Sequence, residues 1–257
     1  MLKKEWALAA ALLLGATQVW ADKAEELKRR FNDFISAGDM IESVQKSPVP
    51  GLYEVVLKTR EVVYTDENFS YIFSGHIIKT DSRTDITQER LDEISRIIPT
   101  KLPLDHAIKM VRGDGSRFLV TFEDPNCGYC KRLQRDLQKV ENVTVYTFLV
   151  PLLGKDSERK SKNIWCAQDR EAAWLKWILE AVTPAQADCG SDTIEQNATL
   201  ARQLGIDGTP TLILANGKRI GGYIPADRLE EEFAAVAKEL ASQDKKAEQK
   251  QDKDKKK

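Results

Sequence analysis

The chain has 257 residues, of which 42% are hydrophobic and 31% are charged, and its formal net charge is −1. This length predicts one or two domains with ordinary buried cores. The near-zero net charge excludes the strong overall basic field that favours general binding of nucleic acid.

The N-terminus has the pattern of an export signal. Lys3 and Lys4 precede an apolar run over residues 7–16, and Ala21 ends a segment that fits a cleavage site. The apolar run is too short to cross a bilayer comfortably. We therefore predict a signal peptide over residues 1–21 and a mature chain in an oxidising compartment, with an uncleaved membrane anchor as the alternative.

The next segment reads as a small β-rich unit. Residues 22–37 have the apolar spacing of an amphipathic helix, and short β-favouring runs separated by turn residues follow up to residue 78. A sheet of this size buries too little surface to be stable alone, and its edge strand needs a cover. We therefore predict that residues 22–82 form a dimerisation domain.

Residues 83–105 are predicted to be a linker. Their apolar spacing between residues 85 and 98 indicates a helix, and Pro99 and Pro103 end it. The helix is interpreted as a rigid spacer or, alternatively, as a segment that packs onto a neighbouring domain.

Residues 106–241 mix strands and helices. Strands are expected at residues 108–111, 117–122, 143–150, 211–214 and 219–224, and helices from residue 127 and over 160–181, 192–204 and 225–240, with a break near Arg170.

The last segment, residues 242–257, is rich in lysine and lacks large apolar side chains. We expect it to be disordered, as a solvated tail or as an attachment to anionic lipid or an acidic partner.

Cys127 and Cys130 are the most informative residues of the chain. They follow a β-favouring run and open a helix-like run, so the first thiol is expected at a helix N-terminus. Unpaired backbone N–H groups and the helix dipole favour the thiolate there, and the thiolate is the nucleophile in disulfide exchange. Glu123 and Asp124 lie just upstream and are expected to be exposed charges at the end of the strand.

A metal or haem site is the alternative reading of this motif. No second close cysteine pair follows at zinc spacing, and His76 and His106 lie far from every cysteine in sequence. Lys131 stands where a c-type haem motif needs histidine. We therefore predict no metal and no cofactor.

The chain has four cysteines, and three disulfide pairings are possible for them.

The CxxC motif, the order of elements after residue 106, and Thr209-Pro210 before an apolar strand together resemble the thioredoxin fold. With the export signal and the front unit, the chain resembles the bacterial periplasmic disulfide isomerase family of DsbC type. The resemblance implies a mixed α+β and α/β architecture: a C-terminal thioredoxin domain with a helical insertion, a small N-terminal β-rich dimerisation domain and a helical linker.

The resemblance also assigns roles to residues. It implies that Cys127 attacks and Cys130 resolves, that Gly128-Tyr129 completes the active-site motif, and that Thr209 and Pro210 form a cis-proline loop that binds substrate. It further implies a structural disulfide. The implied disulfide joins two cysteines of the insertion, Cys166 and Cys189. The alternative is that these two cysteines form a second catalytic pair.

The function implied is that of an enzyme, a periplasmic thiol:disulfide interchange protein that isomerises non-native disulfides. Its partners would be misfolded disulfide-containing exported proteins, a membrane thiol-reducing electron donor of DsbD type and a second copy of the chain, with no nucleic acid. Three alternatives remain: a DsbG-like reductase or chaperone for single or sulfenylated cysteines, an oxidase, and a non-catalytic chaperone-type binding protein.

Overall fold

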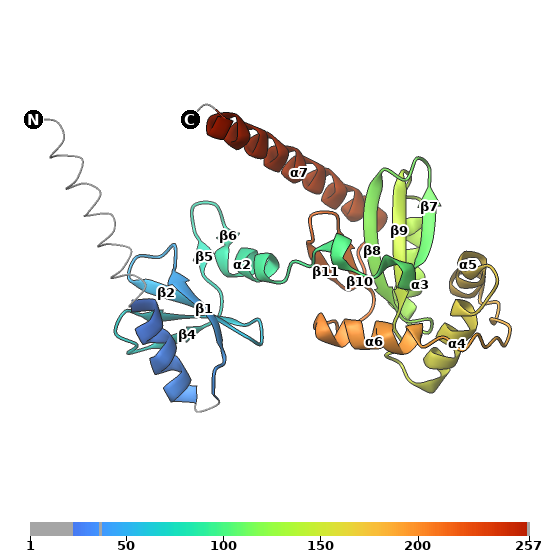
Figure 1. The fold of residues 1–257 in the computed structure, drawn as a ribbon, viewed down its shortest axis with the longest axis horizontal. Coiled ribbons are helices and arrows are strands. Elements are labelled where there is room, and N and C mark those ends of the chain that lie inside the picture. The colour runs from blue at the N-terminus through green and yellow to red at the C-terminus, as the bar shows by residue number, and fades with distance from the viewer. Residues whose placement is uncertain (1–22, 36–37, 256–257) are drawn as a thin grey trace, which may run out of the picture. The chain divides into compact units, whose positions relative to one another are not determined.

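The computed structural model describes residues 23–35 and 38–255, with side chains as far as residue 245. The expected signal peptide lies outside these residues. The chain divides into two compact units between Ser95 and Arg96 (Figure 1). The expected linker is therefore divided: residues 96–105 fold with the second unit, because Ile97 and Leu102 are buried in its core.

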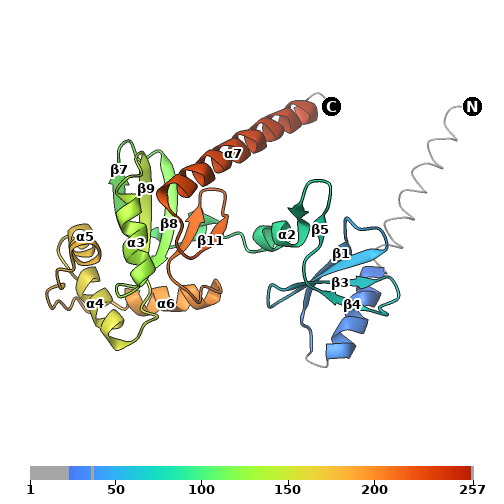
Figure 2. The same cartoon turned by 180° about the vertical axis from the view of Figure 1, so that it is seen from behind.

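The first unit is a four-stranded antiparallel sheet between two helices (Figure 2). Val55 and Val63 pack under Phe31 of the helix over residues 23–35. Side chains alternate along a strand, so Val56 and its neighbours face the opposite helix, α2. The elements, with the sheet in the order β1-β2-β3-β4 and a separate β5–β6 pair, are β1 (Ile41–Lys46), β2 (Leu52–Leu57), β3 (Val62–Asp66), β4 (Ile72–Ser74), β5 (Ile78–Lys79), β6 (Thr84–Asp85) and α2 (Ile86–Ile94).

Helix α2 is shorter than the sequence predicts. Asp85 caps its start by accepting a hydrogen bond from the Gln88 N–H, and the helix ends at Ile94 instead of Ile98. Ile98 is extended because the following proline disfavours helical geometry. The Ile97 N–H instead donates to the Gly217 carbonyl at 3.0 Å, which holds this segment on the second unit.

The second unit is built on a five-stranded sheet of order β11-β10-β8-β9-β7. Strands β8 and β9 are parallel, and the other pairs are antiparallel. The strands are β7 (Ile108–Arg112), β8 (Arg117–Glu123), β9 (Val143–Leu149), β10 (Thr211–Leu214) and β11 (Arg219–Gly221). The α-helices are α3 (Gly128–Leu137), α4 (Lys155–Trp165), α5 (Arg170–Glu180), α6 (Thr193–Gln203) and α7 (Ala226–Lys255), and two 3₁₀ turns, η1 (Pro99–Lys101) and η2 (Leu104–His106), precede the sheet.

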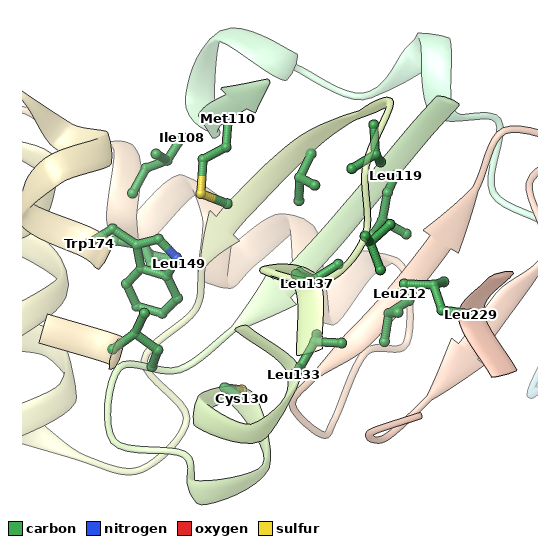
Figure 3. Close-up of a cluster of buried hydrophobic side chains, with 14 of the residues drawn as sticks. Ile108, Met110, Leu119, Cys130, Leu133, Leu137, Leu149, Trp174, Leu212 and Leu229 are labelled. Carbon is green, nitrogen blue, oxygen red and sulfur yellow. The ribbon is translucent and has the colours of Figure 1, made fainter. Parts of the chain in front are cut away.

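Both faces of this sheet are buried. Leu119 and Leu212 belong to the core beneath α3, α5 and α7 (Figure 3). The next residue of each strand, Val120 or Ile213, belongs to the core on the α6 side. Burial on both faces explains why β8 to β10 read as nearly continuous apolar runs.

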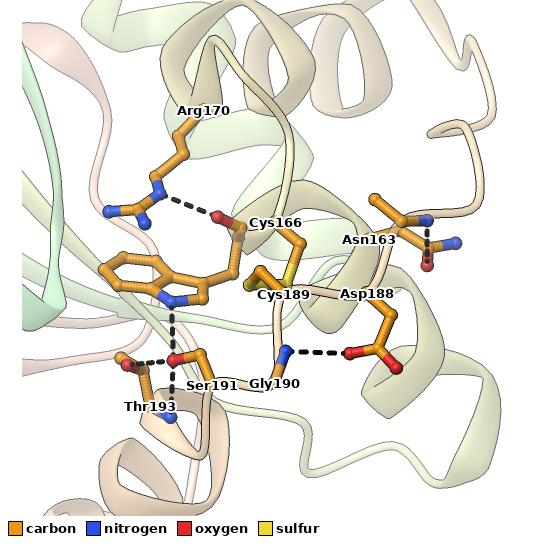
Figure 4. Close-up of a disulfide and its surroundings, with 10 residues drawn as sticks. Asn163, Cys166, Arg170, Asp188, Cys189, Gly190, Ser191 and Thr193 are labelled. Carbon is orange, nitrogen blue, oxygen red and sulfur yellow. Dashed lines mark hydrogen bonds between the residues drawn. A yellow bond between two sulfur atoms is a disulfide. The ribbon is translucent and has the colours of Figure 1, made fainter.

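The helical insertion lies between β9 and β10. The sequence predicts one helical segment with a break near Arg170. The structure has two separate helices there, α4 and α5. A disulfide joins Cys166, at the end of α4, to Cys189, before α6 (Figure 4). Beside it, the Trp165 indole donates to Ser191 Oγ at 3.1 Å, and the Arg170 guanidinium lies 3.7 Å from the centre of the Trp165 ring.

Helix α7 corrects the expectation for the C-terminal segment. It continues to Lys255, through residues that we expected to be disordered from Ser242. Glutamine, lysine, glutamate and alanine are good helix formers, and the segment contains neither glycine nor proline, so the helix begun on the domain can propagate. Among residues 23–35 and 38–255, no helix has the combination of length and apolar composition needed to span a membrane.

Candidate active site

Cys127 lies at the N-terminus of α3, as the sequence predicts. Its backbone is extended, with φ −71° and ψ 120°, and it is the N-cap residue of the helix. The Cys130 N–H points at its sulfur, with 3.4 Å between the nitrogen and Sγ. A thiolate at this position therefore receives hydrogen bonds that the helix itself does not use.

The two thiols differ in accessibility. Cys127 retains 7% of its surface, whereas Cys130, one turn later in α3, has none. Both are free thiols, whereas the other two cysteines of the chain are paired with each other. Incoming disulfides can therefore reach only Cys127, and Cys130 can meet only a sulfur already bound to Cys127.

The loop before β10 faces the first thiol, although the two are far apart in sequence. The Thr209–Pro210 peptide bond is cis. The Thr209 carbonyl oxygen lies 3.2 Å from Cys127 Sγ and accepts its hydrogen when the thiol is protonated. This contact brings the motif and the Thr209-Pro210 loop into one site.

The surroundings of the two thiols separate their pKa values. Hydrogen bonds from the Cys130 side chain, the Thr209 side chain and the α3 backbone lower the pKa of Cys127 to about 5, against an opposing effect of burial. Burial, the hydrogen bond to Cys127 and the nearby charge of Glu123 raise the pKa of Cys130 far above that of an ordinary thiol. Near neutral pH, Cys127 is a thiolate and Cys130 keeps its proton.

The middle residues of the motif form its outer surface. Tyr129 is 59% exposed, and its ring stacks on Tyr223 with 6.5 Å between ring centres. Arg132 covers the same Tyr223 ring, and the Tyr223 hydroxyl donates to Asp136. A side chain at Gly128 would meet no atom within 4 Å, so the surface beside the thiol is open there.

Asp124 corrects the expectation of an exposed strand-end charge. It is fully buried, and its carboxylate accepts hydrogen bonds from the Asn126 N–H, the Leu153 N–H and the Ser157 hydroxyl at 2.7–2.9 Å. Its carbonyl accepts from the Cys127 N–H at 3.0 Å. The residue thus ties the loop that carries the nucleophile to the start of the helical insertion.

The loop is held from a second side by the insertion. The Trp177 indole donates to the Pro125 carbonyl at 2.6 Å, and the Lys160 ammonium lies 3.9 Å from the centre of the Trp177 ring. Lys160 also donates to the Asn126 side chain at 2.8 Å. Sequence reasoning missed these residues, because nothing in their local pattern shows that the insertion returns to this loop.

Glu123 also differs from the prediction of an exposed charge at the end of the strand. It too is fully buried, and its Oε1 accepts a hydrogen bond from Gln134 of α3 at 2.6 Å. Burial raises its pKa to about 8. The only signal of this burial in the sequence was its place directly after the apolar, β-favouring run over residues 117–122, and the structure makes it the last residue of β8. Within residues 23–35 and 38–255, no group of three or more His, Cys, Asp or Glu side chains is arranged to hold a metal ion.

The lowered pKa of Cys127 predicts the pH dependence of its reactivity. Alkylation of the reduced protein by iodoacetamide should be almost independent of pH above about pH 6 and fall about tenfold per unit below about pH 5. Because folding lowers this pKa, the thiolate stabilises the reduced native state fully above the unfolded thiol's pKa of about 8.5, and this contribution is lost as the pH falls to about 5. A titration midpoint near that of a free thiol contradicts the assignment.

Comparisons with known proteins agree with this geometry. Residues 104–237 match the family model of the thioredoxin-like domain, and residues 18–88 match that of the disulfide bond isomerase protein N-terminal domain. In the crystal structure of a disulfide interchange protein from Neisseria gonorrhoeae, 97% of that chain superposes on 52% of this one, with a TM-score of 0.50 and 39% identity. The protein is thus a thioredoxin-fold thiol–disulfide oxidoreductase.

Curated relatives specify the family. A probable thiol:disulfide interchange protein DsbC from Bordetella parapertussis is 42% identical over 208 residues, which is 81% of this chain and 73% of the relative. The thiol:disulfide interchange protein DsbC of Escherichia coli K12 is 28% identical over 195 residues, 73% of this chain and 79% of the relative. The chain belongs to the DsbC family of thiol:disulfide interchange proteins.

Proposed function

We propose that this protein isomerises non-native disulfides through Cys127 and Cys130. The observation that carries the proposal is the contrast between the two thiols. Cys127 is a thiolate that attacks at neutral pH, whereas Cys130 is buried and keeps its proton, so a mixed disulfide on Cys127 persists before Cys130 can resolve it. The family model matched by residues 18–88 is that of a disulfide bond isomerase.

The reaction follows from this contrast. The Cys127 thiolate attacks a substrate disulfide, forms a mixed disulfide and releases one substrate thiolate. That thiolate attacks another substrate disulfide, and a substrate thiolate finally displaces Cys127. When the substrate stalls, Cys130 attacks the Cys127 sulfur and leaves the enzyme oxidised. The Thr209-Pro210 loop is the proposed ledge on which an extended substrate segment lies beside Cys127, supported by the 3.2 Å contact between them.

The compartment and partners form part of the proposal. The pattern of residues 1–21 supports export to the periplasm, where misfolded disulfide-containing proteins are the substrates. A membrane thiol-reducing donor of DsbD type would return oxidised enzyme to the dithiol state. Exposed apolar side chains beside the loop, among them Tyr129 and Leu153, suit substrates that expose apolar surface.

The proposal is tested by refolding a protein with scrambled disulfides in a glutathione buffer. We expect the reduced enzyme to restore native disulfides catalytically, with a Cys127/Cys130 disulfide that glutathione reduces less readily than that of a strong oxidase. Fast reduction of a sulfenylated substrate without reshuffling would indicate the DsbG-like reductase instead. Suppressed aggregation that survives replacement of both cysteines, without catalysed refolding, would indicate a binding protein.

We also propose that the first unit forms a homodimer through β4. This strand pairs with β3 on one side only, and its segment exposes 69% of Tyr71 and 48% of Phe73. A free sheet edge with exposed aromatic side chains is a surface that association covers.

Light scattering tests this proposal on residues 22–257. We expect a dimer for the native sequence and a monomer for Phe73→Asp, because an unpaired carboxylate is costly to bury in an interface. Val111→Asp is the matched control, since Val111 is 52% exposed on β7, an edge strand of the other sheet. A monomeric native chain, or a Phe73→Asp variant that stays dimeric, excludes this interface.

A further inference from the structure

Arg132 is an exposed arginine of the active-site helix α3 that the exchange chemistry described above does not use. Its guanidinium carbon lies 4.7 Å from the centre of the Tyr223 ring. Among the described side chains, its N–H groups have neither a hydrogen-bond acceptor nor an ion-pair partner. A guanidinium held over an aromatic ring has lost much of its freedom but keeps its N–H groups available, so it is prepared to bind a carboxylate.

The acidic residue one turn further along α3 does not take this group. The Asp136 carboxylate accepts a hydrogen bond from the Tyr223 hydroxyl at 2.6 Å and one from the Lys139 ammonium at 2.5 Å. The hydrogen bond from Lys139 is the main cause of the lowered pKa of Asp136, and the charge of Arg132 contributes less. Asp136 therefore fixes the aromatic ring beneath the guanidinium and leaves the guanidinium itself open to a ligand.

Tyr223 also joins this arginine to the substrate ledge. The Gly222 N–H donates to the Pro210 carbonyl at 2.8 Å, so Tyr223 directly follows a residue that is bonded to the ledge. The ring of Tyr129, which lies between the two cysteines of the motif, stacks on the same Tyr223 ring. The ledge, the motif and Arg132 therefore border one continuous surface.

The spacing along α3 sets which substrate residue reaches the guanidinium. Arg132 follows Cys127 by five positions, which is about 7.5 Å along the axis of a helix. An extended segment advances about 3.3 Å per residue, so two residues cover a similar distance. Side chains alternate along an extended segment, so the residue two positions from the substrate cysteine points to the same side as its sulfur. That residue is the one placed to meet Arg132.

We propose that Arg132, supported by Tyr223, binds the carboxylate of an aspartate or glutamate two residues from the reacting cysteine of the substrate. Arg132 is thus a specificity residue, which contacts the substrate and takes no part in the exchange of sulfur bonds. Cys127 attacks as a thiolate, and a nearby acidic side chain of the substrate repels it; pairing with Arg132 offsets this repulsion. The proposal rests on the exchange and the ledge proposed above, whether the exchange isomerises or reduces.

Matched peptides test this specificity with the reduced protein. Each peptide has one cysteine, joined by a disulfide to thionitrobenzoate, and carries glutamate or glutamine two positions before or after that cysteine. Cys127 Sγ bonds to the peptide sulfur, the disulfide of the probe breaks, and thionitrobenzoate leaves as a coloured thiolate whose absorbance gives the second-order rate constant. At one of the two positions, we expect the glutamate peptide to react about fivefold faster than its glutamine twin at low ionic strength.

Substitutions of Arg132 should change this preference in a graded way. Arg132→Gln should remove it and react with the glutamine peptide within about twofold of the native rate. Arg132→Lys keeps the charge but not the planar fork, so it should retain a smaller preference. Arg132→Glu should react faster with a lysine peptide than with the glutamate peptide. The matched control is Arg135→Gln, which removes another exposed arginine from α3 and should keep the full preference.

The outcomes separate this site from the exchange reaction itself. Rates for glutamate and glutamine twins that agree within about 1.5-fold at both positions overturn the specificity site. A preference that persists in Arg132→Gln, or one that Arg135→Gln loses equally, overturns it as well, since the attraction is then not local to Arg132. The glutamine peptide measures exchange without the carboxylate, so failure of the native protein to attack it contradicts the proposed function instead.

Discussion

Replacing Cys127 by serine should abolish thiol–disulfide exchange, with a loss of more than about a thousandfold in the rate of disulfide reduction. Cys127 is the thiol that retains exposed surface, faces the Thr209 carbonyl and has the lowered pKa. A serine hydroxyl at the same helix N-terminus stays protonated at neutral pH and cannot form a disulfide.

Cys130→Ser is the matched control for this change. It removes one sulfur from the same motif but leaves the nucleophile, so the variant should still attack a disulfide and then accumulate as a mixed disulfide with its substrate. Mass spectrometry after acid quenching measures that species. Exchange by Cys127→Ser at the native rate, or a stable adduct on Cys130 in that variant, would show that the roles of the two thiols are assigned wrongly.

Replacing Asp124 by alanine should cause the largest loss of stability among single changes near the site, about 3 kcal/mol or more in the free energy of unfolding. The change leaves the Asn126 N–H, the Leu153 N–H and the Ser157 hydroxyl without their acceptor in a buried position. The backbone carbonyl of residue 124 still accepts the Cys127 N–H in this variant, but the loop that carries it loses its side-chain anchor, so exchange should also slow, by about tenfold.

Urea unfolding of the reduced protein and of its Asp156→Ala control measures this effect. Asp156 also accepts a hydrogen bond from Asn126, from the side-chain amide instead of the backbone N–H, but its own side chain is 47% exposed. Its loss should therefore lower the free energy of unfolding far less than the loss of Asp124 does. Equal losses for the two variants would show that burial of Asp124 is not what holds the loop.

The parts of the site that follow from local chemistry were predicted from the sequence. The β-favouring run before Cys127 and the polar helix after it place the thiol at a helix N-terminus, and the structure has it there. The approach of Thr209 to Cys127 came from the resemblance to a known fold and not from the spacing of 82 residues between them. Pairing of β8 with β10 creates this approach, and no local pattern encodes that pairing.

The errors in the predicted fold have the same origin. Helix α2 ends early because Ile97 bonds to Gly217, a contact between segments distant in sequence. Helix α7 continues into a segment whose composition alone favours disorder, because it extends a helix already begun on the second unit.

The sequence by itself determined the identity of the reacting groups, the helix start that activates Cys127, and the alternation of strands and helices around them. Only the tertiary structure decided which carboxyl groups are buried. Glu123 and Asp124 read as ordinary charges after a strand, and burial beneath α3 and the helical insertion makes one a titratable acid beside the resolving thiol and the other an anchor of the loop. The physical reason is that the protonation and hydrogen bonding of a carboxyl group depend on what surrounds it in space, and those surroundings come from residues far along the chain.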